Sequence, residues 1–133
     1  MVLFSTTLTP RFYETDALGH ISNTALNAWF EVGRVRLLEE LGAHDAQPAN
    51  WVLAAIAMDF LEETFYGSDV TVAITDVSVG DTSLKIACEM RQDGRLTVRG
   101  NAVLVHLGPD SKSKCRVPDT LREAIAELGG DGQ

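Results

Sequence analysis

The spacing of apolar residues predicts one long helix near the start of the chain. Apolar side chains recur at intervals of three and four residues, the spacing of one helical face, at Leu26, Trp29 or Phe30, Gly33, Leu37 and Leu41. Ser22 or Asn23 can cap the start of this helix, and Gly42 follows its end. We therefore predict a helix over Asn23–Leu41, roughly 28 Å long for a rise of 1.5 Å per residue.

From Trp51 onward the apolar spacing becomes that of β-strands. Residues Trp51–Leu61 are nearly all apolar, which favours a strand buried on both faces, with a helix as the alternative. Apolar and polar residues then alternate, and a slip in phase at Asp76 and Val77 predicts a bulge. Asp93-Gly94 stands between two alternating segments and predicts a two-residue hairpin turn. The alternating segments are residues 70–79, 84–90 and 96–104.

Shorter elements flank these segments. Val2–Phe12 is rich in β-branched and aromatic residues and predicts a short first strand, in which Pro10 is tolerable only near an end or at an edge. Pro118 opens a short helix, whose apolar stripe is Leu121, Ile125 and Leu128. Polar segments predict loops at Tyr13–Ser22, His44–Asn50 and Gly108–Lys114.

The elements follow the order strand, long helix, four strands, short helix. One long helix and a meander of antiparallel strands pack best with the sheet wrapped around the helix. We predict an α+β fold with an antiparallel sheet of about five strands around one long helix, and a short C-terminal helix. The length of 133 residues fits a single domain, 1–133. Covering the other face of the sheet calls for a second subunit.

The charge distribution narrows the range of partners. The formal net charge of −8 argues against a general nucleic-acid binder, which needs a basic surface. Six of the eleven Lys and Arg lie between Arg91 and Arg116, against two acidic residues, so this segment carries +4 and the remainder −12. A local basic patch suits a small polyanion better than a polymer. Solvated charges on an outer strand face are the alternative interpretation.

The sequence shows no pattern typical of a membrane span, an export signal or a metal site. No apolar run reaches about 18 residues, and the N-terminus lacks a basic region before a long apolar core. Cys88 and Cys115 form no metal or disulfide spacing pattern. We expect a cytoplasmic protein that binds no metal and no membrane.

One stretch concentrates groups capable of chemistry where the long helix begins. Asp16, His20 and Asn23 stand there within a few residues of one another. The first N–H groups of a helix lack partners within it and carry about half a positive charge, so they can bind a carbonyl oxygen. Each side chain also has a structural alternative. Asp16 can accept hydrogen bonds from its own loop, His20 can be a structural histidine, and Asn23 can cap the helix.

The segment RFYETDALGHISNTALNAWFEVGR resembles the opening motif of the hotdog-fold acyl-CoA thioesterases, the 4-hydroxybenzoyl-CoA thioesterase-like group. The matching positions occur in order and without a gap: Arg11, Glu14, Asp16, Gly19, His20, Asn23, Glu31 and Arg34. The similarity is weaker beyond this motif but extends over most of the chain. Ser22, Leu26 and Glu62-Glu63 depart from the family pattern, which leaves the substrate open.

The resemblance implies an enzyme that hydrolyses an acyl-CoA to free acid and CoA, with no cofactor beyond the CoA of the substrate. Asp16 would be the nucleophile or the general base, and the backbone N–H of Asn23 would stabilise the oxyanion. The plant acyl-carrier-protein thioesterases use the histidine that matches His20. The alternatives are a hotdog hydratase acting on an enoyl or hydroxyacyl thioester, and an acyl-CoA-binding module without activity.

The resemblance further implies a homodimer or homotetramer and a site for the CoA phosphates in the basic segment. Some hotdog enzymes place a second acid, here Asp59, in the site of the neighbouring subunit. Glu31 and Arg34 stand at a helical pair spacing on the wetter side of the helix, so we interpret them as a surface or interface pair. The candidates for substrate binding are Gly19, Asp59, Arg91, Arg99, Lys112, Lys114 and Arg116.

Overall fold

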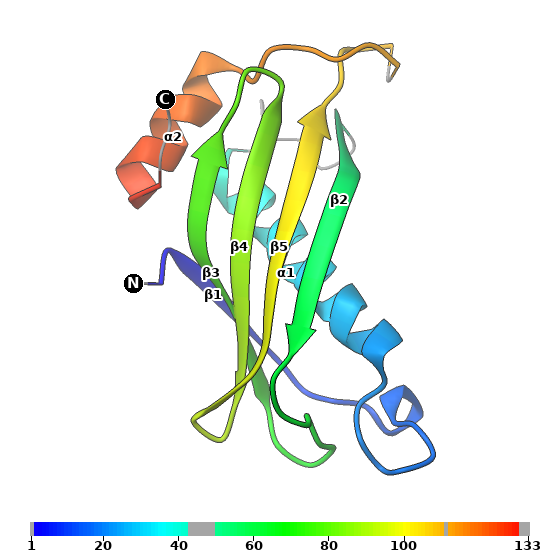
Figure 1. The fold of residues 1–133 in the computed structure, drawn as a ribbon. Helices are drawn as coiled ribbons and strands as arrows, with labels where there is room; N and C mark the ends of the chain where they lie inside the picture. The colour runs from blue at the N-terminus through cyan, green and yellow to red at the C-terminus, as the bar shows by residue number, and fades with distance from the viewer. Residues whose placement is uncertain (1, 43–49, 111, 131–133) are drawn as a thin grey trace.

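The computed structural model describes residues 2–42, 50–110 and 112–130, and the predicted loop at 44–49 lies outside them. The elements are β1 (Phe4–Leu8), the 3₁₀ turn η1 (Phe12–Glu14), α1 (Asn23–Leu41), β2 (Trp51–Phe60), β3 (Val70–Val79), β4 (Ser83–Gln92), β5 (Arg95–His106) and α2 (Asp119–Leu128). The five strands form one antiparallel sheet in the order β1-β3-β4-β5-β2. The sheet curves around α1 (Figure 1), as predicted.

The centre of the sheet is the meander β3-β4-β5. Its bulge and its tight turn both lie where the sequence predicts them. The register between β3 and β4 shifts between Ile74 and Asp76, which confirms the predicted bulge. The turn between β4 and β5 is Asp93-Gly94, with φ of 52° and 78°. Two positive φ values in succession match the type I′ turn that fits the twist of a hairpin.

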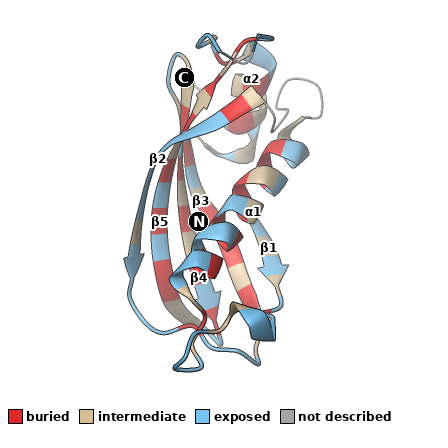
Figure 2. Ribbon diagram, turned by 90° about the vertical axis from the view of Figure 1, so that its right-hand side faces the viewer, coloured by how far each residue is buried: buried red, intermediate tan, exposed pale blue. Residues whose placement is uncertain are grey.

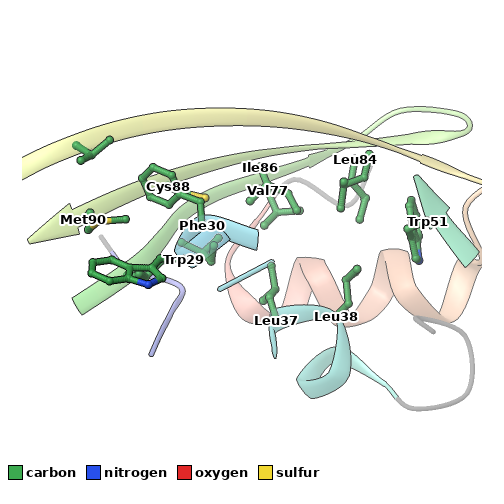
Figure 3. Close-up of a cluster of buried hydrophobic side chains, with 14 of the residues drawn as sticks. Trp29, Phe30, Leu37, Leu38, Trp51, Val77, Leu84, Ile86, Cys88 and Met90 are labelled. Carbon is green, nitrogen blue, oxygen red and sulfur yellow. The ribbon is translucent and has the colours of Figure 1, made fainter. Parts of the chain in front are cut away.

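Helix α1 packs its apolar side chains against the inner face of this sheet (Figure 3). Phe30, Leu37 and Leu38 are almost fully buried there. Gly33 faces β3 so closely that a Cβ atom would stand 2.8 Å from Cγ1 of Val72. This glycine therefore allows the helix to approach the sheet.

Arg34 is not on the wetter side of α1, so that part of the prediction was wrong. Its exposed fraction is only 4%, because it follows Phe30 by one turn and precedes Leu37 and Leu38 by another. A helical period of 3.6 places these residues on neighbouring faces. No ion pair joins Arg34 to Glu31 in the described part of the chain.

Strand β2 is a strand, as predicted, but it is not buried on both faces. Among the described strands it pairs only with β5, and it forms one edge of the sheet. After the buried Trp51, most of its residues are exposed, including Val52, Leu53 and Ile56 (Figure 2). The prediction was wrong because apolar composition does not show whether other residues of the same chain cover the strand.

The opposite edge of the sheet is β1, which is shorter than the predicted strand Val2–Phe12. It ends at Leu8, two residues before Pro10, and pairs with β3. At the C-terminus, α2 buries Leu121 and Ile125 against the core. None of the helices in the described ranges is long and apolar enough to span a membrane.

Candidate active site

The loop before α1 is a tightly hydrogen-bonded turn. Thr15 and Ile21 form an isolated antiparallel bridge, and the N–H of Asp16 donates to the carbonyl oxygen of His20 at 2.7 Å. Gly19 closes the turn with a φ of 81°, a conformation that residues with a Cβ rarely adopt. The turn therefore holds Asp16 and His20 in a fixed relation, and Gly19 has a backbone role.

The carboxylate of Asp16 is exposed and is partly used by its own loop. Its Oδ1 accepts hydrogen bonds from the N–H groups of Leu18 at 2.8 Å and His20 at 3.1 Å. This is the structural alternative that the sequence left open. Within the described ranges Oδ2 has no hydrogen-bond partner. The loop thus fixes the orientation of the carboxylate through one oxygen and leaves the other oxygen available.

The ring of His20 is partly buried and contacts the segment after β2. Its Nδ1 lies 3.1 Å from Oε2 of Glu63, and its ring packs edge-on against Phe65 with centroids 5.1 Å apart. A carboxylate at Nδ1 fixes the ring orientation and leaves Nε2 for a further partner. Sequence reasoning did not assign Glu63 to the site, although Glu62-Glu63 stood out as a departure from the family pattern.

A cavity of about 430 Å³ lies where α1 begins and β2 ends. It is lined by Ile21, Asn23, Leu26, Phe60, Leu61, Glu62, Glu63 and Thr64. The cap of α1 is Ser22, not Asn23: Oγ of Ser22 accepts from the N–H of Ala25, and its carbonyl oxygen accepts from Leu26. The N–H groups of Asn23 and Thr24 belong to the first helical turn and find no partner inside the helix. They are the donors left for a ligand beside this cavity.

The segment after β2, residues 62–68, is held by two residues that were not among the predicted site residues. The side-chain amide of Gln92, almost fully buried, accepts from the N–H of Phe65 and donates to the carbonyl oxygens of Phe65 and Ser68. Arg95 lies 3.4 Å from Glu62 and stacks over Phe65. The one sequence feature related to these contacts is the predicted Asp93-Gly94 turn, which places Gln92 and Arg95 next to each other.

The basic segment does not form one patch on the protomer, so that prediction was wrong. Arg91 and Arg99 lie on β4 and β5 toward the end where α1 begins, and Arg91 is 3.4 Å from Glu89. Lys112, Lys114 and Arg116 lie beyond the opposite end of β5, where Arg116 pairs with Asp81 and Asp119. Strand β5 separates the two groups by roughly 3.3 Å per residue. Figure 1 shows the β4–β5 turn and the segment that follows β5 at opposite ends of the sheet.

Asp59 lies close to the cavity but does not line it. It stands on β2 directly across from Arg99 of β5 and is exposed. The described residues contain no group of three His, Cys, Asp or Glu side chains that could hold a metal ion. Of the predicted catalytic residues only Asn23 lines the cavity; Asp16 and His20 stand in the adjoining loop, and His20 contacts the cavity wall through Glu63.

The chain belongs to the thioesterase-like superfamily, whose family model matches residues 10–125. Its architecture is the hotdog fold of the solved thioesterase structures that it matches, as predicted. No curated protein matches the sequence.

Three solved structures illustrate the similarity. A predicted thioesterase from Bacillus stearothermophilus is 34% identical, with a TM-score of 0.84 over 94% of this chain and 95% of that one. A thioesterase from Thermus thermophilus, complexed with coenzyme A and Zn, is 25% identical, with a TM-score of 0.87 over 96% and 94%. A 1,4-dihydroxy-2-naphthoyl-CoA thioesterase from Synechocystis shares the fold at 16% identity, with a TM-score of 0.81 over 94% and 96%.

Proposed function

We propose that this protein hydrolyses an acyl-CoA thioester to the free acid and CoA, at the cavity where α1 begins. The observation that carries the proposal is that Asn23, whose N–H has no partner among the described residues, lines this cavity next to the loop that contains Asp16 and His20. The Thermus thermophilus relative, a thioesterase complexed with coenzyme A, supports CoA as the thiol.

The start of α1 would stabilise the charge that develops on the thioester carbonyl. As the carbonyl carbon is attacked, its oxygen becomes negative, and the N–H of Asn23 at the positive end of the helix donates to it. One preorganised donor of this kind is worth about a hundred- to a thousandfold in rate. Hydrogen bonding by Ser22 to the next turn keeps this N–H in place.

Asp16 would supply the attacking oxygen or activate it. As a general base, its Oδ2 takes a proton from water, the water oxygen bonds to the carbonyl carbon, and the C–S bond breaks as the proton passes to sulfur. As a nucleophile, Oδ2 itself displaces the thiolate, and water then hydrolyses the mixed anhydride. Both routes use the oxygen that the loop leaves without a partner.

His20 would bind the attacking water or the thioester, with Glu63 as its positioning residue. The 3.1 Å contact with Glu63 occupies Nδ1 and leaves Nε2 for such a partner. Gln92 keeps the Glu63–Ser68 segment against the Asp16 loop through its three hydrogen bonds. Glu63, which departs from the family pattern, would thus affect the orientation of the His20 ring.

For the CoA phosphates, Arg91 and Arg99 are the candidates on the same protomer as the cavity. Lys112, Lys114 and Arg116 could reach the same CoA only from a second copy of the chain. We propose a homo-oligomer, a dimer or a tetramer, as the working unit, because the exposed apolar β2 edge ends at Phe60, in the wall of the cavity.

A thiol-release assay over short, long and aromatic acyl-CoAs tests the function. We expect release of free thiol from at least one class, and a fall in kcat of about a hundred- to ten-thousandfold in Asp16→Asn. Asp76→Asn, the same change at an exposed position on β3, is the matched control. Loss of enoyl-CoA absorbance without thiol release would indicate a hydratase, and tight binding without turnover a binding module.

A further inference from the structure

The wall of the cavity at the start of α1 has an apolar part and an acidic part. The apolar part is formed by Ile21, Leu26, Phe60 and Leu61. The acidic part is formed by Glu62 and Glu63, which closely follow β2. Among the described residues, no Lys or Arg lines this cavity. A ligand in the cavity therefore meets both an apolar surface and negative charge.

The charge of Glu62 is only partly offset by its partner. Nη1 of Arg95 lies 3.4 Å from Oε1 of Glu62 and donates to the carbonyl oxygen of Glu63 at 3.4 Å. Its guanidinium also stacks over Phe65. Both distances are long for a hydrogen bond, and a partly exposed ion pair of this kind is weak. Since Arg95 does not line the cavity, a ligand there meets the carboxylate rather than its cation.

The charge of Glu63 also persists beside the cavity. Its Oε2 lies 3.1 Å from Nδ1 of His20. A neutral imidazole that donates this hydrogen bond orients the carboxylate but does not cancel its charge. Asp16, in the adjoining loop, adds a third carboxylate near the same end of α1. The immediate surroundings of the cavity are therefore negative.

The cavity also contains a neutral polar group that has no partner among the described residues. Thr64 is 2% exposed, and its Oγ1 makes no hydrogen bond. Its carbonyl oxygen accepts from the N–H of Ile21 at 2.8 Å, which fixes the residue beside the Asp16 loop. A buried hydroxyl without a partner is unfavourable, and it can donate to or accept from an uncharged ligand. This hydroxyl is a second sign that the cavity receives a ligand.

We infer that Glu62 and Glu63 are specificity-determining residues that exclude acyl groups ending in a carboxylate, so that the cavity accepts uncharged acyl groups. The inference rests on the proposed function, which puts the thioester carbonyl at the N–H of Asn23 and the acyl group against the apolar wall. A carboxylate at the far end of that acyl group loses water and lies near two like charges, and both changes are unfavourable. A carboxamide of the same shape has no charge to repel.

Two pairs of substrates that differ only in charge test the inference. Glutaryl-CoA is compared with its terminal amide, and 4-carboxybenzoyl-CoA with 4-carbamoylbenzoyl-CoA, so that aliphatic and aromatic acyl groups are both covered. The measured quantity is the kcat/KM of the amide divided by that of the carboxylate. We expect this ratio to be at least about ten in wild type at low salt. It should fall as the salt concentration rises, because salt screens partly exposed charges.

Glu62→Gln removes one of the carboxylates with little change of shape. We expect the amide-to-carboxylate ratio to fall at least about threefold and its salt dependence to weaken. The ratio compares two substrates in the same variant, so a general change in activity does not affect it. Glu40→Gln removes an exposed carboxylate at the opposite end of α1. It is the matched control and should keep the wild-type ratio.

Thioether analogues of the four compounds, which cannot be hydrolysed, separate this inference from the thioesterase function. Calorimetry with these analogues measures the same preference as a ratio of dissociation constants. Equal kcat/KM values for the two members of each pair would support the thioesterase and overturn the inference. Tighter binding of the amide analogues without thiol release from any acyl-CoA would support the charge selection and overturn the function.

Other outcomes would also overturn the inference. One is a wild-type ratio in Glu62→Gln, and another is a wild-type ratio that does not change with salt. Failure of all four analogues to bind would overturn it together with the function. A preference for the carboxylates that disappears in Arg95→Met would show instead that the guanidinium turns into the cavity and binds the anion.

Discussion

The two flanks of α1 differ in how their polar groups are satisfied. On the flank toward β1, the indole N–H of Trp29 donates to Oε2 of Glu14 at 2.8 Å, and Oε1 of Glu14 accepts from the N–H of Arg11 at 2.7 Å. Every one of these partners comes from the chain itself. The Glu14 carboxylate thereby ties the helix to the segment that leads into the Asp16 loop.

On the flank toward β2, the equivalent groups have no partner within the described residues. A second tryptophan, Trp51, keeps an unpaired indole N–H, and Arg34 keeps an unpaired guanidinium. Both flanks are built from aromatic and charged side chains of similar type, so composition does not explain the difference. The β1 flank is completed by contacts within the chain, whereas the β2 flank leaves both of these groups without a partner among the described residues.

The largest effect on stability is expected on the β1 flank. Glu14→Ala removes two acceptor contacts and leaves the indole N–H of the buried Trp29 unpaired, which lowers the free energy of unfolding by about 2–3 kcal/mol. Urea unfolding measures this loss, with Glu40→Ala, the same change at an exposed position on α1, as the control. Equal stability of the two variants would show that Glu14 does not hold the helix.

Two tryptophan variants compare the flanks directly. Trp29→Phe and Trp51→Phe remove the same atoms from two buried rings, but only Trp29 has a partner for its N–H among the described residues. We expect Trp29→Phe to be the more destabilising by about 1.5 kcal/mol, since the lost hydrogen bond is to a carboxylate. Thermal unfolding at low protein concentration gives the difference. A larger loss in Trp51→Phe would reverse the comparison.

The smallest effect concerns the thiol beneath the β2 flank. Burial raises the pKa of Cys88 from 9.0 to about 12, although the Arg34 guanidinium acts in the opposite direction. Above pH 9 the unfolded chain loses this proton while the folded chain keeps it, so stability falls as pH rises from 9 toward 12. The loss attributable to Cys88 is about 1 kcal/mol between pH 9 and pH 10.

One variant separates the contribution of this thiol from that of the other groups in the protein. Cys88→Ala should unfold with a flatter dependence on alkaline pH than wild type. Urea unfolding at pH 8, 9 and 10 supplies the comparison. Identical slopes in the two proteins would contradict a raised pKa at Cys88.

The sequence predicts the elements better than their surroundings. The bounds Asn23–Leu41 and the bulge near Asp76 follow from spacing, which is a local property of the chain. The exposure of β2 does not follow from spacing, because an apolar strand has the same sequence pattern whether or not its own chain covers it. Arg34 was misplaced for a related reason: a charged residue predicts a solvated face unless the partner that allows its burial is known.

The candidate site divides in the same way. Asp16, His20 and Asn23 are neighbours in sequence, and one motif found all three. Glu63 contacts His20, and Gln92 binds the backbone of Phe65, only because the fold brings distant parts of the chain together, so no local pattern identifies them. The basic residues are the opposite case. They are close in sequence, but the twelve residues of β5 separate them in the structure.

The short β1 strand limits how this protein can aggregate. It offers only five residues at the outer edge of the sheet, and Pro10 closely follows them; proline has no backbone N–H to donate to a further strand. A two-fold contact through β2 would use the long edge of both copies at once. The sheet could then extend no further in either direction, so even a concentrated solution would contain finite particles rather than growing filaments.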